Sequence, residues 1–151
     1  MGSKKVVEGV VFDPIKKVKV SGRIRIENGR IVEIEHDDSV MQPIILPGFV
    51  DSHVHIESSM LTPQEFSKIA KRHGTIAVVA DPHEIANVAG VEGINFMIEN
   101  SKGAEIRFFF GAPSCVPTSS LDDCYKIIDS CEIEKLLQRE DIYFLGEMMN
   151  F

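Results

Sequence analysis

Two histidines separated by one residue, His53 and His55, carry the clearest chemical signal in the sequence. They follow an apolar stretch from 44 to 50, and side chains two apart on a strand point to the same face. Both imidazoles can therefore reach one ion, and neutral imidazole is a common ligand of zinc, iron and manganese. Two ordinary histidines at a solvent-facing strand end are the alternative. Because the strand before them is predicted to be buried, we expect metal binding.

Three further polar residues follow predicted strands. Glu147 comes after the apolar stretch 142–145, and we expect it to bridge metal ions, although a carboxylate there could also cap a helix or be solvated. Asp81 and His83 flank Pro82 after another apolar stretch. They could bind substrate, support a ligand or hold another ion. A structural turn closed by hydrogen bonds of Asp81 is an equally good interpretation.

Apolar stretches that begin near residues 44, 75, 106 and 142 predict the strands that position these side chains. They are continuous rather than alternating, as in parallel strands covered on both faces. Helical segments between them complete a β-α-β-α succession, so we expect an α/β fold with a parallel sheet. An open doubly wound sheet and part of an eight-stranded barrel both fit. The polar residues would share the sheet edge where active sites of such folds lie: Asp51, His53, His55, Asp81, His83, Glu84 and Glu147.

Three helical segments are expected between these strands. The capping box Thr62-Pro63-Gln64-Glu65 predicts a helix that begins at Pro63 and ends at Gly74, with Glu65 reaching back to the N-cap. A second helix is predicted over 91–100, and further helical turns over 121–139.

The first 43 residues predict a small β domain that precedes the β-α units of 44–151. Val18–Glu27 and Arg30–Glu35 alternate apolar and polar residues, as strands with one wet face do. Asn28-Gly29 between them is favoured in a tight two-residue hairpin turn. A pair of strands alone is marginal in water, so we expect this region to pack on other structure, in a β-sandwich-like arrangement.

Composition excludes several classes of function. The formal charge of −7, with Lys and Arg scattered among more numerous acids, argues against nucleic acid as a partner. Apolar runs end after a few residues, so we expect no membrane span and no secretory signal. The three cysteines, Cys115, Cys124 and Cys131, include no C-x-x-C pair, which indicates a reducing, cytoplasmic location and buried thiols.

The string Leu46-Pro47-Gly48-Phe49-Val50-Asp51-Ser52-His53-Val54-His55 resembles the first barrel strand of the amidohydrolase superfamily. Later strings resemble the adenine deaminase family in particular: Ile56-Glu57-Ser58-Ser59-Met60, Asp81-Pro82-His83-Glu84-Ile85, Pro113-Ser114-Cys115-Val116-Pro117 and Gly146-Glu147-Met148-Met149-Asn150-Phe151. They occur in order and with normal spacing from the hairpin at Asn28 to the last residue.

The resemblance implies a (β/α)8 TIM-type barrel, of which this chain would be the first half, and hydrolysis of adenine to hypoxanthine and ammonia. It implies a binuclear centre of divalent metals, manganese or iron, with zinc as a third candidate. His53 and His55 would bind one ion and Glu147 would bridge the two. The other histidine ligands, and an aspartate that carries a proton to the leaving ammonia, would lie on later strands outside these 151 residues.

Other functions of the same fold stay open. The chain could be an inactive truncated product or an interaction module, or the chemistry could be another amidohydrolase reaction, such as deacetylation of an amino sugar. We expect the chain alone to be inactive, with the missing carboxy-terminal half of the barrel as its partner. Open strand edges at 44–50 or 142–145 also predict homo-oligomers that form by edge pairing.

Overall fold

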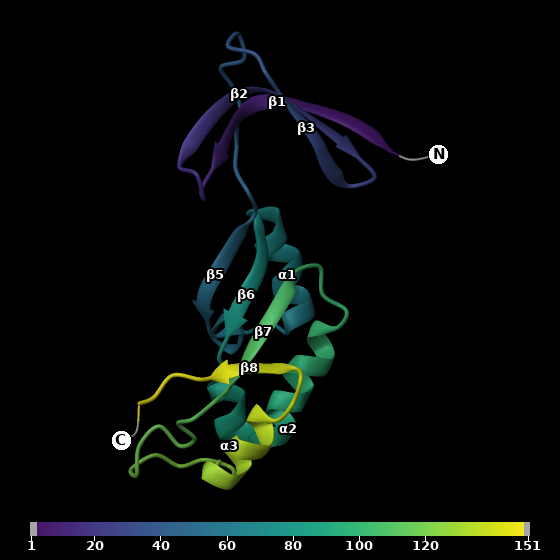
Figure 1. The fold of residues 1–151 in the computed structure, drawn as a ribbon. Coiled ribbons are helices and arrows are strands. Elements are labelled where there is room, and N and C mark those ends of the chain that lie inside the picture. Colours follow the sequence, from purple (N-terminus) through teal and green to yellow (C-terminus); the bar gives the residue numbers. More distant parts are fainter. Residues whose placement is uncertain (1–2, 150–151) are drawn as a thin grey trace. The chain divides into compact units, whose positions relative to one another are not determined.

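The structure is a computed structural model that describes residues 3–149, and the chain divides between Pro47 and Gly48 into two compact units. Each unit holds a four-stranded sheet, with strand orders β3-β2-β1-β4 and β5-β6-β7-β8 (Figure 1). The described residues form both strands and helices, as predicted for an α/β protein. Within the described residues, no helix combines the length and the apolar character that a membrane span needs.

The first sheet is mainly antiparallel. It consists of β1 (Lys4–Asp13), β2 (Val18–Glu27), β3 (Arg30–His36) and β4 (Ile44–Ile45), of which β4 runs parallel to β1. Asn28 and Gly29 both have positive φ angles, 54° and 76°, so the predicted tight hairpin turn is confirmed. The described residues of this unit form one sheet rather than the two facing sheets of a sandwich.

The single strand predicted over 44–50 is broken at Pro47-Gly48. Its first part, β4, pairs with β1, and its second part contributes to β5 (Phe49–Val54) of the other sheet. Proline has no N–H to donate to a strand ladder, which explains why pairing stops there. The first compact unit therefore extends to Pro47, beyond the predicted boundary at residue 43.

The second sheet is parallel, as the sequence predicts. Its strands are β5, β6 (Thr75–Ala80), β7 (Arg107–Ala112) and β8 (Ile142–Leu145). They alternate with the short 3-10 helix η1 (Ile56–Ser59) and with α1 (Pro63–Arg72), α2 (His83–Ser101) and α3 (Ser130–Leu137). The core joins apolar side chains of α2 and α3 to those of β6, β7 and β8. The prediction that the strands are buried on both faces is wrong for the two edge strands: Phe49 and Val50 of β5 are 54% and 56% exposed, and Tyr143 of β8 is 58% exposed. Ile76 of β6 is also 53% exposed.

The helices differ from the prediction at their ends. α1 begins at Pro63 as predicted, but Thr62 makes no side-chain cap bond, and Glu65 pairs with Lys68 instead of reaching back to the N-cap. α2 begins at His83, well before the predicted start at 91, and contains a non-helical residue at Gly90. α3 covers only part of the predicted stretch 121–139.

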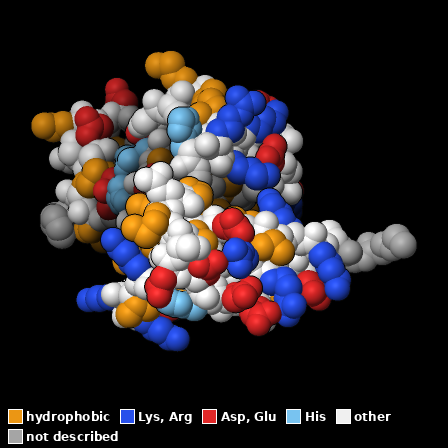
Figure 2. Space-filling model, turned by 90° about the horizontal axis from the view of Figure 1, so that it is seen from above, with side chains coloured by type: hydrophobic (Ala, Val, Ile, Leu, Met, Phe, Trp, Pro, Cys, Tyr) orange, Lys and Arg blue, Asp and Glu red, His pale blue; other side chains and the backbone are white. Residues whose placement is uncertain are grey.

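The structure also shows where the charged side chains and the three cysteines lie. Figure 2 shows basic and acidic side chains on the same face, with several Lys and Arg side chains gathered toward its upper right. Of the cysteines, Cys115 is buried and Cys124 is partly buried, but Cys131 is exposed, so the predicted burial is wrong for Cys131. This cysteine lies in the first turn of α3. The buried residue of that helix is Leu136, near its other end.

The hydroxyl of Ser67 joins α1 to the segment that enters β7. Ser67 is fully buried; it donates to Gln64 O at 2.7 Å and accepts from Glu105 N at 3.0 Å. We expect Ser67→Ala to lower the free energy of unfolding by about 1–2 kcal/mol, because Glu105 N–H loses its acceptor. Chemical denaturation measures this. Ser101→Ala, which removes only a local bond to Ile98 O, is the control; an equal loss in both variants would contradict the assignment.

Candidate metal centre

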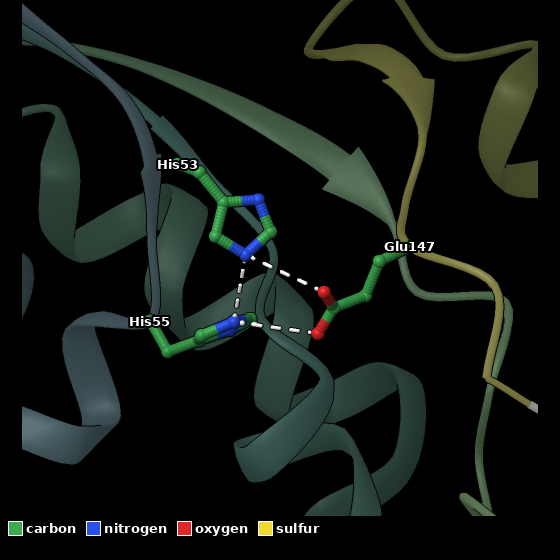
Figure 3. A group of neighbouring side chains, drawn as sticks. All are labelled: His53, His55 and Glu147. Carbon is green, nitrogen blue, oxygen red and sulfur yellow. Dashed lines mark hydrogen bonds and ion pairs between the residues drawn. The ribbon is translucent and has the colours of Figure 1, made fainter.

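Two imidazoles and one carboxylate converge at the carboxyl end of the parallel sheet (Figure 3). His53 lies in β5, His55 follows directly after it, and Glu147 follows β8 at the opposite edge of the sheet. The Nε2 atoms of the histidines are 3.0 Å apart. Glu147 Oε2 is 3.4 Å from His53 Nε2, and Glu147 Oε1 is 3.4 Å from His55 Nε2. Residues far apart in the sequence thus direct three side chains that can bind metal toward one point.

A backbone contact fixes which nitrogen of His55 is free. Its Nδ1 is 3.0 Å from the carbonyl oxygen of Asp81. A carbonyl oxygen only accepts, so Nδ1 carries the proton and Nε2 keeps its lone pair toward Glu147 and His53. This is the arrangement of a metal-binding histidine whose second nitrogen donates to an outer group.

Asp81 also positions Glu147. Asp81 is only 3% exposed, and its Oδ2 accepts a 2.7 Å hydrogen bond from Glu147 N. Gly146 N donates to Ala112 O at 2.7 Å, so the chain after β8 is held from two sides. A Cβ at Gly146 would lie 2.9 Å from Ala112 O and closer still to Asp81 Oδ2, which leaves room for glycine alone.

His83 extends the cluster from the first turn of α2. Its Nδ1 is 3.6 Å from Glu147 Oε1 and 3.7 Å from Asp81 Oδ1, and its ring centroid is 4.6 Å from that of His55. The neighbouring Asp81 carboxylate raises the pKa of His83 above its ordinary value, although burial acts in the opposite direction. The surroundings of this nitrogen therefore favour a positive charge.

The donor set fits a divalent metal centre. Asp81 Oδ1 and His83 Nδ1 are both buried and face each other at 3.7 Å, but neither makes a hydrogen bond among the described residues, so an additional polar group or ion would stabilise both. The close Nε2 atoms of His53 and His55 likewise need a proton or a cation between them. Ligand atoms within 4.8 Å of one another form three overlapping groups: His53, His55, Glu147; His55, His83, Glu84; and Asp81, His83, Glu147. Imidazole with carboxylate suits zinc, iron or manganese.

The structure brings together most, but not all, of the polar residues predicted at the strand ends. Asp51 accepts from His53 N at 3.2 Å and is absent from the three ligand groups. His36 and His73 are exposed and lie outside these groups.

The sequence places Glu84 at this edge of the sheet without indicating its contacts, and it indicates no role for Glu57 and Ser58. Glu84 shares a ligand group with His55 and His83. Ser58 Oγ donates to Glu84 Oε1 at 2.6 Å, and Glu57 Oε1 accepts from Ile85 N at 3.2 Å. Burial raises the pKa of Glu57 above its ordinary value. The sequence does show many polar residues at 57–59 and 81–84, but their positions do not indicate which side chains contact each other.

The comparison with known protein families gives a match that covers the second unit. Residues 44–149 match the amidohydrolase family. This range contains the whole cluster and begins at the strand before the His53-Val54-His55 motif.

Individual relatives match over nearly the whole chain. A Methanosarcina barkeri protein named adenine deaminase is 47% identical over 144 residues, which are 95% of this chain and 26% of that protein. A Borreliella afzelii adenine deaminase is 52% identical over 142 residues, 93% of this chain and 26% of the relative. One from Parabacteroides distasonis is 47% identical over 146 residues, 97% and 27% respectively. The chain thus spans about a quarter of the length of these curated relatives.

Proposed function

Because the chain belongs to the amidohydrolase family, we propose that it supplies the first part of the active site of a metal-dependent adenine deaminase, which converts adenine to hypoxanthine and ammonia. The observation that carries the proposal is the convergence of His53, His55 and Glu147 from opposite edges of one parallel sheet. Relatives named adenine deaminase, at 43–52% identity, indicate the substrate.

His53, His55 and Glu147 would hold the metal centre. Glu147 Oε2 faces His53, whereas Oε1 lies near both His55 and His83, so the carboxylate could contact one ion held by His53 and His55 and a second ion beside His83. We assign two divalent ions, manganese or iron in the first place and zinc otherwise. Such ions supply Lewis-acid activation of water for hydrolysis near neutral pH. The contribution of this chain is to hold the three ligand side chains in place before the substrate binds, so that little reorganisation accompanies the reaction.

Asp81 and His83 would contact the substrate or a second ion. Asp81 Oδ2 is used by the backbone of Glu147, so Asp81 Oδ1 and His83 Nδ1 are the atoms left to contact a substrate or a second ion. Both can exchange hydrogen bonds with a purine, whose ring nitrogens and amino group offer acceptors and donors.

The remaining catalytic groups would come from strands outside these residues, in a complete (β/α)8 barrel. We therefore expect the 151 residues alone to leave adenine unchanged. An inactive product or interaction module of the same fold, and deacetylation of an amino sugar, are the competing functions. Neither has an observation of its own in its favour.

A chimera tests the function directly. Residues 48–149 of this chain replace the matching segment of the Methanosarcina barkeri adenine deaminase, and hypoxanthine and ammonia are measured after incubation with adenine. We expect deamination. Glu147→Ala in the chimera should lower the rate roughly a thousandfold, because bound metal stabilises the transition state by several kcal/mol.

Glu140→Ala serves as the matched control, since this exposed carboxylate lies outside the three ligand groups. It should leave deamination unchanged. A folded chimera that binds metal but does not deaminate adenine would contradict the proposed function, as would an unchanged rate in the Glu147→Ala chimera.

A further inference from the structure

The segment that follows His55 is built as a rigid turn. Ile56, the first residue of η1, is completely buried in the core of the second unit. Ser59 Oγ donates to Ile56 O at 2.5 Å, and Met60 N donates to Glu57 O at 2.8 Å. The buried anchor and these short bonds fix the backbone from which Glu57 and Ser58 project.

Both side chains reach the first turn of α2. The N-cap of α2 is Pro82, whose side chain has no acceptor, so a free N–H of the first turn must find another partner. Glu57 Oε1 supplies it by accepting from Ile85 N at 3.2 Å. Ser58 Oγ donates to Glu84 Oε1 at 2.6 Å. The turn after one strand thus caps the helix after the next strand.

This turn of α2 carries two members of the candidate metal centre. Ligand atoms of His55, His83 and Glu84 lie within 4.8 Å of one another, although they come from two segments. The contact of His55 Nδ1 with Asp81 O and the bond from Asp81 N to Val54 O at 3.3 Å join the two strand ends, whereas the bonds from Glu57 and Ser58 join η1 to the first turn of α2 itself. These bonds therefore help to set the spacing of His55, His83 and Glu84.

We propose that Glu57 and Ser58 are positioning residues of the metal centre: Glu57 holds the first turn of α2 at a fixed distance from His55, and Ser58 orients the Glu84 carboxylate toward His55 and His83. A glutamate side chain has many rotamers, and a hydroxyl bond to one oxygen selects among them while the other oxygen stays free. The inference deepens the proposed function, on which it rests for the presence of metal.

Co²⁺ binding to the full chain tests the inference, with affinity taken from calorimetry and ligand geometry from the visible spectrum. We expect Ser58→Ala and Glu57→Ala each to weaken Co²⁺ binding about tenfold and to change the spectrum, because outer groups that orient ligands typically contribute 10–100-fold to affinity. Ser58→Thr and Glu57→Gln, which keep a hydroxyl and an acceptor oxygen, should restore most of the affinity. A merely structural role would not alter the Co²⁺ spectrum.

Ser119→Ala is the matched control, because Ser119 Oγ makes the same kind of bond, 2.7 Å to Asp122 Oδ2, outside the metal centre. It should leave Co²⁺ affinity and spectrum unchanged. Amide hydrogen exchange at Ile85, read by NMR without metal, gives a second measurement: Glu57→Ala should accelerate it and Ser119→Ala should not.

The outcomes separate the inference from the proposed function. Unchanged affinity and spectrum in Ser58→Ala and Glu57→Ala, with a wild type that binds Co²⁺, would overturn the inference and leave the proposed function standing. A wild type that binds no Co²⁺ would contradict the metal centre itself. The positioning of α2 by Glu57 would then be decided by Ile85 exchange alone, and unchanged exchange would overturn it.

Discussion

Replacing His55 by alanine is expected to weaken Mn²⁺ binding by roughly a hundredfold or more, which exceeds the usual effect of an outer group. The variant loses the Nε2 lone pair that faces Glu147 and His53. It also loses the hydrogen bond from Nδ1 to Asp81 O, which links β5 to the end of β6. Calorimetric titration of the full chain with Mn²⁺ measures the change.

His73→Ala is the control for this experiment. His73 is an exposed histidine at the end of α1 and lies outside the three ligand groups, so its removal changes the histidine content without touching the cluster. We expect wild-type affinity. Equal weakening in the two variants would mean that Mn²⁺ binds non-specifically to surface histidines, and it would remove the basis for the metal centre.

The second large effect is expected for Gly146→Ala. The new Cβ would lie 2.9 Å from Ala112 O and closer still to Asp81 Oδ2, distances that real Cβ atoms essentially never show. Relief of this clash must move the carboxylate of Asp81 or the chain after β8, and both moves displace Glu147. We expect a loss of about 1–3 kcal/mol in the free energy of unfolding, together with markedly weaker Mn²⁺ binding.

Gly103→Ala provides a comparison with a similar nominal clash. Its Cβ would approach Gln64 Nε2 at 2.9 Å, but that atom ends a flexible side chain that can move away. We expect little loss of stability and no loss of metal affinity. If Gly146→Ala kept both properties, the fixed position of Glu147 would have no part in the site.

Local patterns were sufficient for the strand-end residues. The alternation of side chains along a strand places His53 and His55 on one side, and the parallel sheet brings Glu147 to the same edge. These inferences need only strand periodicity and the rule that strand ends share an edge. The structure places all three together, as Figure 3 shows.

The start of α2 could not be predicted in the same way. Asp81-Pro82-His83 has the composition of a turn, and Gly90 interrupts the helix, so the apolar periodicity is clear only after residue 90. The real N-terminus lacks a capping side chain of its own and is capped by Glu57. This contact joins residues far apart in the sequence and leaves no periodic signal, which is why the contacts of Glu57 and Ser58 with the first turn of α2 could not be predicted.

The broken strand at Pro47-Gly48 has a similar origin. The stretch 44–50 is uniformly apolar, and hydrophobicity does not tell which of two sheets a residue joins. Pairing of β4 with β1 decides it, through partners that sequence periodicity does not identify.

The most direct test of the account is a crystal structure of the chain grown with Mn²⁺, with data collected at the manganese absorption edge to locate the ion by anomalous scattering. We expect a peak within bonding distance of His53 Nε2, His55 Nε2 and the Glu147 carboxylate. A second peak is expected beside Glu147, on the side of His83. Absence of a peak at the two histidines under saturating Mn²⁺, or a peak only at other surface groups, would contradict the metal centre and the enzymatic function built on it.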